Sequence, residues 1–150
     1  MSPDLCSETE LLTGFARVAR SKATTVRPTS PGEVASVFPL VEANGVIARG
    51  LGRSYGDAAL NEGGYVVDST RMARILDIDS ERGIVRVEAG VSLAQLLARL
   101  APLGWTLPAL PATRHVTVGG AIAADVHGKN HHRVGSFAQH LERFTLHPNE

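Results

Sequence analysis

The stretch Ile47-Ala-Arg-Gly-Leu-Gly-Arg-Ser-Tyr-Gly-Asp57 is the most informative part of the sequence. Residues 46–48 are apolar and predict the end of a buried strand, and glycines follow at positions 50, 52 and 56. Glycine adopts positive φ at low cost and lets a ligand approach the backbone closely. Successive exposed N–H groups in such a turn form an anion-binding nest. The stretch therefore predicts a loop that holds a diphosphate, while a tight turn that uses glycine for shape alone stays open as the alternative.

The glycine spacing separates this loop from two common nucleotide-binding motifs. Gly50-x-Gly52-x-x-x-Gly56 is one residue longer than the Rossmann fingerprint, and Asn61-Glu-Gly-Gly64 stops any helix that would open inside it. The Walker pattern fails as well, because no Gly-Lys-Ser/Thr is present. The loop is a diphosphate candidate outside both folds.

Composition is that of a globular protein with one domain: 150 residues, 43% apolar and 20% charged. The net charge is zero, with 15 basic and 15 acidic residues, which gives no electrostatic case for nucleic acid or an acidic membrane surface. Cys6 is the only cysteine, so no internal disulfide forms, as in a reducing compartment. No run is long enough to cross a membrane, and the N-terminus lacks the pattern of a signal peptide. We expect a cytoplasmic protein or one peripheral to a membrane.

The first half of the chain predicts alternating helix and strands. Residues 1–22 are uncertain, although Leu11, Leu12, Phe15 and Val18 suit one short amphipathic face. Residues 23–27 are expected to be extended. Ser30-Pro-Gly-Glu33 predicts a helix start, and Pro39 predicts a kink or an early end. Strands are expected at 46–49 and 65–68.

The second half predicts a hairpin and a capped helix. Residues 75–90 read as two strands joined by a turn at 80–83. Ser92 and Gln95 form a capping box, and Val91 and Leu96 a hydrophobic staple, for a helix that Pro102 and Gly104 end. Residues 105–110 suit an edge strand or an extended segment, and 143–147 a strand. These elements predict an α+β domain (α/β-like) over 23–150, with a small mixed sheet and flanking helices and no linker that splits it.

A second informative stretch runs from Thr113 to Ser136. Thr117-Val-Gly-Gly120 offers small residues and free N–H groups before an expected helix at 121–126, where a helix N-terminus would favour an anion. His127 and His131 have the spacing of metal ligands on a helix, with His132 beside them, but no glutamate completes the pattern H-E-x-x-H. A polar loop that lines a ligand is favoured over a metal site, solvated histidines stay open as the alternative, and no metal is predicted.

Three motifs together resemble the decaprenylphosphoryl-β-D-ribose 2′-oxidase family, within the vanillyl-alcohol-oxidase-like proteins that carry a PCMH-type FAD-binding domain. They are the loop Ala48–Asp57, Thr117-Val-Gly-Gly120 and His127-Gly-Lys-Asn-His-His132, and the likeness extends over about residues 15–141. The resemblance implies oxidation of a ribose 2′-hydroxyl to a ketone in the making of an arabinose donor for cell-wall arabinan. It further implies FAD as cofactor, a polyprenyl-phosphate ribose as substrate, an NAD-dependent reductase as partner, and location at the periplasmic face as an option.

The resemblance also implies the site residues. Tyr55, His127 and Lys129 are expected near the flavin ring and the substrate. The expected cofactor contacts are Ala48, Arg49, Gly50, Leu51, Gly52, Arg53, Ser54, Tyr55, Gly56, Asp57, Ala58, Ala112, Thr117, Val118, Gly119, Gly120, Ala124, Asp125, Val126 and His127.

Three positions depart from the family or the wider group. Arg53 stands where covalent members of the wider group carry histidine, so a noncovalent FAD is implied. Ala112 replaces a usual glycine, and Ala124 a cysteine found in one member; both keep a small side chain. The family's substrate domain and its sugar-facing lysine are expected outside these 150 residues, so the catalytic base is too. An aldonolactone or alditol oxidase fragment and a catalytically silent nucleotide-binding module are the alternative functions.

Overall fold

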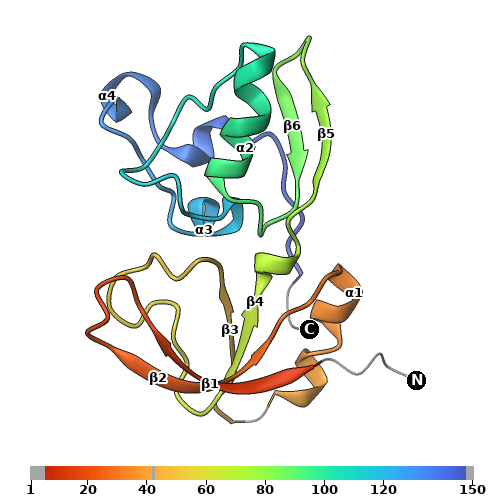
Figure 1. The fold of residues 1–150 in the computed structure, drawn as a ribbon, viewed down its shortest axis with the longest axis vertical. Helices are drawn as coiled ribbons and strands as arrows, with labels where there is room; N and C mark the ends of the chain where they lie inside the picture. Colours follow the sequence, from red (N-terminus) through yellow and green to blue (C-terminus); the bar gives the residue numbers. More distant parts are fainter. Residues whose placement is uncertain (1–5, 42, 148–150) are drawn as a thin grey trace. The chain divides into compact units, whose positions relative to one another are not determined.

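The computed structural model describes residues 6–41 and 43–147, which divide into two compact units (Figure 1). Unit 1 comprises the described residues up to Met72 together with Leu146 and His147, and unit 2 comprises Ala73–Thr145. Each unit has a hydrophobic cluster of its own. In the described residues, no helix is both long and apolar enough to cross a membrane.

Unit 1 is built on a four-stranded mixed sheet in the order β1-β2-β4-β3. β1 and β2 pair antiparallel, whereas β2–β4 and β3–β4 are parallel. The predicted strands at 46–49 and 65–68 and the extended stretch from residue 23 are confirmed. The bounds are β1 Ser7–Thr13, β2 Arg20–Val26, β3 Val46–Arg49 and β4 Tyr65–Asp68.

The segment after β2 packs against this sheet. Val37 packs against Val26 and Val67, and all three are buried. α1 (Pro31–Ala35) begins as predicted, since the Ser30 hydroxyl accepts the N–H of Glu33 at 3.3 Å. α1 ends before Pro39, which lies in the 3₁₀ helix η1 (Phe38–Leu40). The predicted early end is therefore confirmed.

The N-terminal segment differs from its prediction. Leu11 and Leu12 belong to strand β1, and Phe15 and Val18 lie in the turn that follows, so these residues form no single amphipathic face. Ion pairs help to hold β1 in place: Arg27, just after β2, contacts Glu10 at 2.6 Å and Asp68 at 3.4 Å. These pairs join residues far apart in sequence, and no local pattern reveals them. Residues 1–5 of the uncertain segment lie outside the described residues.

The connection between β3 and β4 is unusual. Parallel neighbours need a crossover, which is commonly a helix. Here residues 50–64 make the crossover as a loop without helix or strand (yellow in Figure 1), followed after β4 by the 3₁₀ helix η2 (Ser69–Arg71). A long irregular loop inside a compact unit commonly serves a function.

Unit 2 begins with the predicted hairpin. β5 (Ile75–Asp79) and β6 (Ile84–Val87) pair antiparallel, and Gly83 closes the turn at φ 67°. The indole N–H of Trp105 donates to the carbonyl of Ser80 at 3.1 Å, so the segment after the next helix supports the turn. The hairpin prediction is confirmed.

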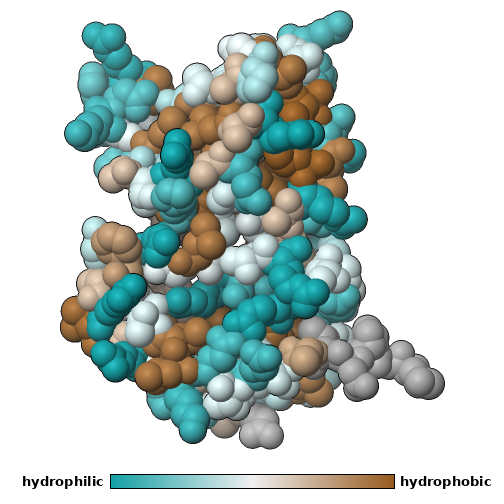
Figure 2. Space-filling model, viewed as in Figure 1, coloured by the Kyte–Doolittle hydropathy of each residue, from teal (hydrophilic) through white to brown (hydrophobic). Residues whose placement is uncertain are grey.

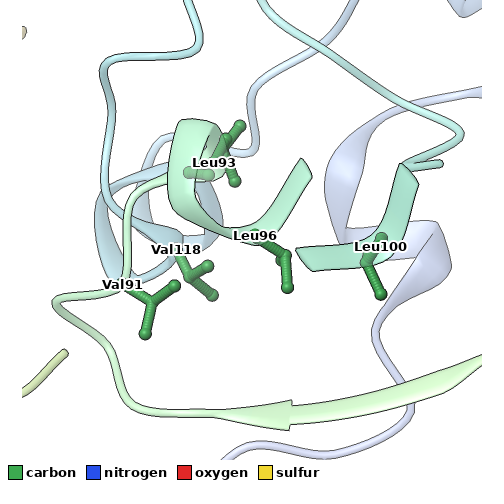
Figure 3. Close-up of a cluster of buried hydrophobic side chains, with 6 residues drawn as sticks. Val91, Leu93, Leu96, Leu100 and Val118 are labelled. Atoms are coloured by element: carbon green, nitrogen blue, oxygen red, sulfur yellow. The ribbon is translucent and has the colours of Figure 1, made fainter. Parts of the chain in front are cut away.

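α2 (Leu93–Leu100) is the longest helix among the described residues, and its predicted cap is present. The Ser92 hydroxyl accepts from the N–H of Gln95, and the Gln95 side chain accepts from the N–H of Ser92 at 2.9 Å. Figure 3 shows Leu96 and Leu100 pointing from α2 toward the light-green strand, with Val91 and Val118 beside them. The helix passes into the 3₁₀ helix η3 (Ala101–Leu103) and stops at Gly104, φ 79°.

Three predictions for the rest of unit 2 change. α3 spans Val118–Ala123, so it starts three residues before the predicted helix and takes both glycines into its first turn. Residues 105–110 form neither helix nor strand, so the expected edge strand is absent there, and residues 143–147 form no strand either. The remaining elements are α4 (His131–Val134) and the 3₁₀ helix η4 (Phe137–His140).

Candidate functional site

Two glycines set the shape of the loop after β3. Gly52 and Gly56 have φ of 65° and 59°, in the left-handed region that other residues adopt at a cost. A Cβ at Gly52 would also lie against the Arg49 guanidinium. Gly50 is not among the left-handed glycines, so glycine conformation matters at two of the three predicted positions.

The second half of the loop is fixed by hydrogen bonds. The N–H of Leu60 donates to the backbone carbonyl of Asp57 at 2.8 Å, and the N–H of Gly63 donates to the backbone carbonyl of Lys22 at 2.8 Å. The Asn61 amide donates to the carbonyls of Gly45 and Tyr65, at 3.1 and 3.2 Å. This half is therefore anchored to both neighbouring strands.

The first half of the loop has no such partners. Within the part of the chain that the structure describes, no backbone N–H from residue 51 to residue 58 donates a hydrogen bond. All of these residues except Gly52 are exposed. A run of free donors with left-handed glycines is the donor set that an anion requires, so these residues fit a diphosphate.

The Arg49 side chain lies under this loop. Its guanidinium donates to the carbonyl of Ala59 at 2.9 Å and to that of Thr13 at 2.8 Å. Burial lowers the pKa of Arg49, while the nearby carboxylates of Asp68 and Glu10 act in the opposite direction. The guanidinium therefore binds two backbone carbonyls of the protein itself. The sequence had suggested a contact between Arg49 and the cofactor, and the side chain makes these internal contacts instead.

The turn between β1 and β2 contacts the loop, and no motif in the sequence predicted this contact. A Cβ at Gly14 would collide with the carbonyl oxygen of Gly56 and lie 3.1 Å from that of Ser54. The N–H of Phe15 donates to the backbone carbonyl of Ser54 at 2.9 Å. The Phe15 ring packs edge-on against the Tyr55 ring, with the ring centroids 5.5 Å apart. A lone Gly-Phe pair some 40 residues away carries no sequence signal for this contact.

The remaining predicted side chains of the loop face solvent. Tyr55 keeps 74% of its surface exposed despite the contact with Phe15. The other exposed ones are Ala48, Leu51, Arg53, Ser54, Asp57 and Ala58. The loop thus presents backbone donors and exposed side chains together.

The start of α3 in unit 2 offers fewer donors than predicted. The N–H of Val118 donates to the carbonyl of Val91 at 2.7 Å, and the N–H of Gly119 donates to the carbonyl of Ala89 at 2.8 Å. The N–H of Gly120 donates to the Thr117 hydroxyl at 3.1 Å. The prediction of free N–H groups here was wrong, because the residues before α2 and the cap use them. Gly119 instead permits close packing, since a Cβ there would lie 3.0 Å from that of Ala89.

The segment after α3 is tied to η4. Asp125 has φ 40°, and its carboxylate accepts the N–H of Ala138 at 2.9 Å. The carbonyl of Val126 accepts the N–H of Phe137 at 2.8 Å. Ala124 and His127 are exposed here, as are Ala112 and Lys129 elsewhere in unit 2.

The histidines do not share a helix. His131 begins α4, whereas His127 lies before it in an isolated bridge with Ser136. Their ring centroids are 5.1 Å apart, and His131 Nδ1 lies 3.1 Å from the carbonyl oxygen of Gly128. No cluster of three or more metal-ligating side chains occurs among residues 6–41 and 43–147. The ligand spacing on a helix, which suggested a metal, is not realised.

Comparisons with known proteins show which family this chain resembles. The sequence profile of the family described as "FAD binding domain" matches residues 23–147. Decaprenylphosphoryl-beta-D-ribose oxidase of Mycolicibacterium smegmatis is 48% identical over 141 residues, which are 92% of this chain and 31% of the relative. L-gulonolactone oxidase of Mus musculus is 38% identical over 103 residues, 67% of this chain and 23% of the relative.

Solved structures share the fold. Cholesterol oxidase from Brevibacterium sterolicum superposes with a TM-score of 0.71 at 16% identity, over 83% of this chain and 25% of that one. The α+β fold with a mixed sheet and flanking helices is that of a PCMH-type FAD-binding domain, as predicted. The chain spans about a third or less of the length of these relatives.

Proposed function

The chain belongs to the FAD-binding domain family and takes FAD as its cofactor, and we propose that it holds this cofactor in an oxidase that acts on a sugar hydroxyl. The observation that carries the proposal is the run of free N–H groups at 51–58 around Gly52 and Gly56. Donors of this kind suit the diphosphate of FAD. Residues 23–150 act as one FAD-binding domain in this proposal.

The proposed substrate is a polyprenyl-phosphate ribose, oxidised at its 2′-hydroxyl in the making of an arabinose donor. Its support is the similarity to decaprenylphosphoryl-beta-D-ribose oxidase across 92% of the chain. An NAD-dependent reductase that acts on the keto product is the proposed partner. Bound FAD supplies a hydride acceptor in this reaction.

The chain's own residues take two roles in the proposal. The loop at 48–58 holds the diphosphate, while Ala112, Thr117–Gly120 and Ala124–His127 line the cofactor further along. Tyr55, His127 and Lys129 orient the ring and the sugar. No residue among the 150 is assigned as the base, since among the described residues the ring contacts of His131 and His140 are to backbone carbonyls and no histidine pairs with a carboxylate that would orient it for proton removal.

The proposal is tested by titrating FAD into the purified chain and following flavin fluorescence. We expect saturable binding that ADP competes away, because both ligands carry a diphosphate. Absence of binding by FAD and ADP alike would leave the chain a catalytically silent relative and would refute the proposal.

A second candidate function is that of an aldonolactone oxidase, favoured by the 38% identity to L-gulonolactone oxidase. The two candidates separate in a longer protein that contains this chain. Bleaching of the bound flavin by a polyprenyl-phosphate ribose supports the first, and bleaching by an aldonolactone alone supports the second.

A further inference from the structure

We propose that Arg49 is a positioning residue, whose planar guanidinium braces the loop at 51–58 in the shape that receives a diphosphate. The inference rests on the proposed function, since it takes this loop as the diphosphate site. It assigns Arg49 a role through the backbone, without contact between its side chain and the cofactor.

The brace joins three separate segments of unit 1. Arg49 ends β3, the carbonyl that its Nη2 reaches belongs to Thr13 at the end of β1, and the carbonyl that its Nη1 reaches belongs to Ala59 in the loop. The Arg49 carbonyl in turn accepts the Ser69 hydroxyl at 3.1 Å. One planar fork therefore fixes the distance between the β1–β2 turn and the loop.

The loop lies directly on this guanidinium. Gly52 is buried, and the space that a Cβ would need there is filled by Arg49. The Thr13 carbonyl held by Arg49 precedes Gly14 and Phe15, which contact Gly56 and Ser54. The brace thus acts on Gly52 directly, and on Ser54 and Gly56 through the β1–β2 turn.

The contacts of Arg49 indicate that the shape of its guanidinium matters and that an ion pair does not. In the described part of the chain the Arg49 side chain bonds to carbonyls alone, while Glu10 and Asp68 form their ion pairs with Arg27. Burying a cation without an ion pair is costly. Lysine would keep the charge but lacks the fork that reaches two carbonyls at once.

The test compares Arg49→Gln and Arg49→Lys with the wild-type chain, and Arg20→Gln, an exposed arginine of β2, serves as the matched control. ADP affinity is measured by calorimetry, and hydrogen exchange is followed at the N–H groups of Phe15 and Leu60, which report on the two anchors of the loop. We expect ADP affinity to fall at least about tenfold in both Arg49 variants. Exchange at Phe15 and Leu60 accelerates in both, and Arg20→Gln changes neither readout.

The outcomes separate this inference from the proposed function. Wild-type chain that binds neither ADP nor FAD refutes the function itself. Unchanged ADP affinity in Arg49→Gln overturns the brace alone, and so does full rescue by Arg49→Lys, because charge would then suffice. Global unfolding of both variants in the cold would assign Arg49 to the fold of unit 1 and also overturn the inference.

Discussion

At the scale of single residues, Gly52 and Gly45 have the same conformation but different surroundings. Their φ values are 65° and 69°, yet a Cβ at Gly45 would meet nothing within 4 Å, whereas one at Gly52 would meet Arg49. The pair separates the cost of a left-handed residue from the cost of filling the loop.

Gly52→Ala is therefore expected to weaken FAD binding by at least about tenfold, while Gly45→Ala stays within about twofold. In both variants the left-handed alanine lowers the free energy of unfolding by about 1–2 kcal/mol, which thermal unfolding measures. Fluorescence titration of FAD measures the binding. Equal affinity in the two variants would contradict a role for the space at Gly52.

Arg53 leads to a prediction about the linkage of the flavin. Its guanidinium stays protonated and has no free nitrogen lone pair for attachment, and it is exposed on the loop. We expect acid precipitation of the FAD-loaded chain to release all flavin into the supernatant. Colour that stays with the protein pellet would reveal a covalent link, with His127 as the first residue to examine.

At the scale of elements, the local signals of the sequence were sufficient where neighbours in the chain decide the structure. The Ser30 and Ser92 caps, the hairpin turn at Gly83 and the stop at Gly104 all depend on residues within one turn of each other. These features were predicted and are present.

Elements that depend on distant partners were not predictable. β1 pairs with β2 and gains ion pairs from Glu8 and Glu10 to Arg27, none of which appears in its own pattern. α3 starts early because carbonyls of Ala89 and Val91 satisfy its first N–H groups. The Gly14 contact with the loop likewise exists only in the folded chain.

The capping box of α2 supports a prediction about stability. Ser92→Ala removes the side chain that accepts the Gln95 N–H, which costs about 1 kcal/mol. We expect thermal unfolding about 2–4 °C lower. The double variant with Gln95→Ala should cost less than the sum of the two single changes, because the two side chains act as one unit. Strict additivity would show that the box contributes nothing as a pair.

The base of the hairpin predicts a response to acid. Glu88 accepts from the Arg74 side chain at 2.6 and 2.9 Å, and this pairing is the main cause of a lowered pKa at Glu88. Its contribution to stability is present above the unfolded-state pKa of about 4.3 and is lost as pH falls through the lower folded-state value. We expect Glu88→Gln to flatten the loss of stability below about pH 4, measured by urea unfolding across pH. An unchanged acid slope would show that the ion pair carries no stability.

At the scale of the whole molecule, apolar surface outside the two cores stands out. Figure 2 shows brown surface over the β5–β6 hairpin, and Leu76 of β5 is 47% exposed. Trp105, which supports the hairpin turn, keeps 40% of its surface exposed. The hairpin is a sheet of two strands, and among the described residues neither strand pairs with a third. Free strand edges beside apolar side chains favour association between chains.

We therefore expect the 150-residue chain to self-associate as its concentration rises, measured by sedimentation velocity. Leu76→Lys should shift the assembly toward monomer, because a lysine on an exposed strand opposes edge pairing. Val18→Lys, at a residue 85% exposed between β1 and β2 and outside any strand, is the matched control and should leave the assembly unchanged. Thermal unfolding of both variants should match the wild type, since neither side chain lies in a core cluster. A chain that stays monomeric at every concentration would show that the hairpin edge and its apolar side chains are insufficient to drive association.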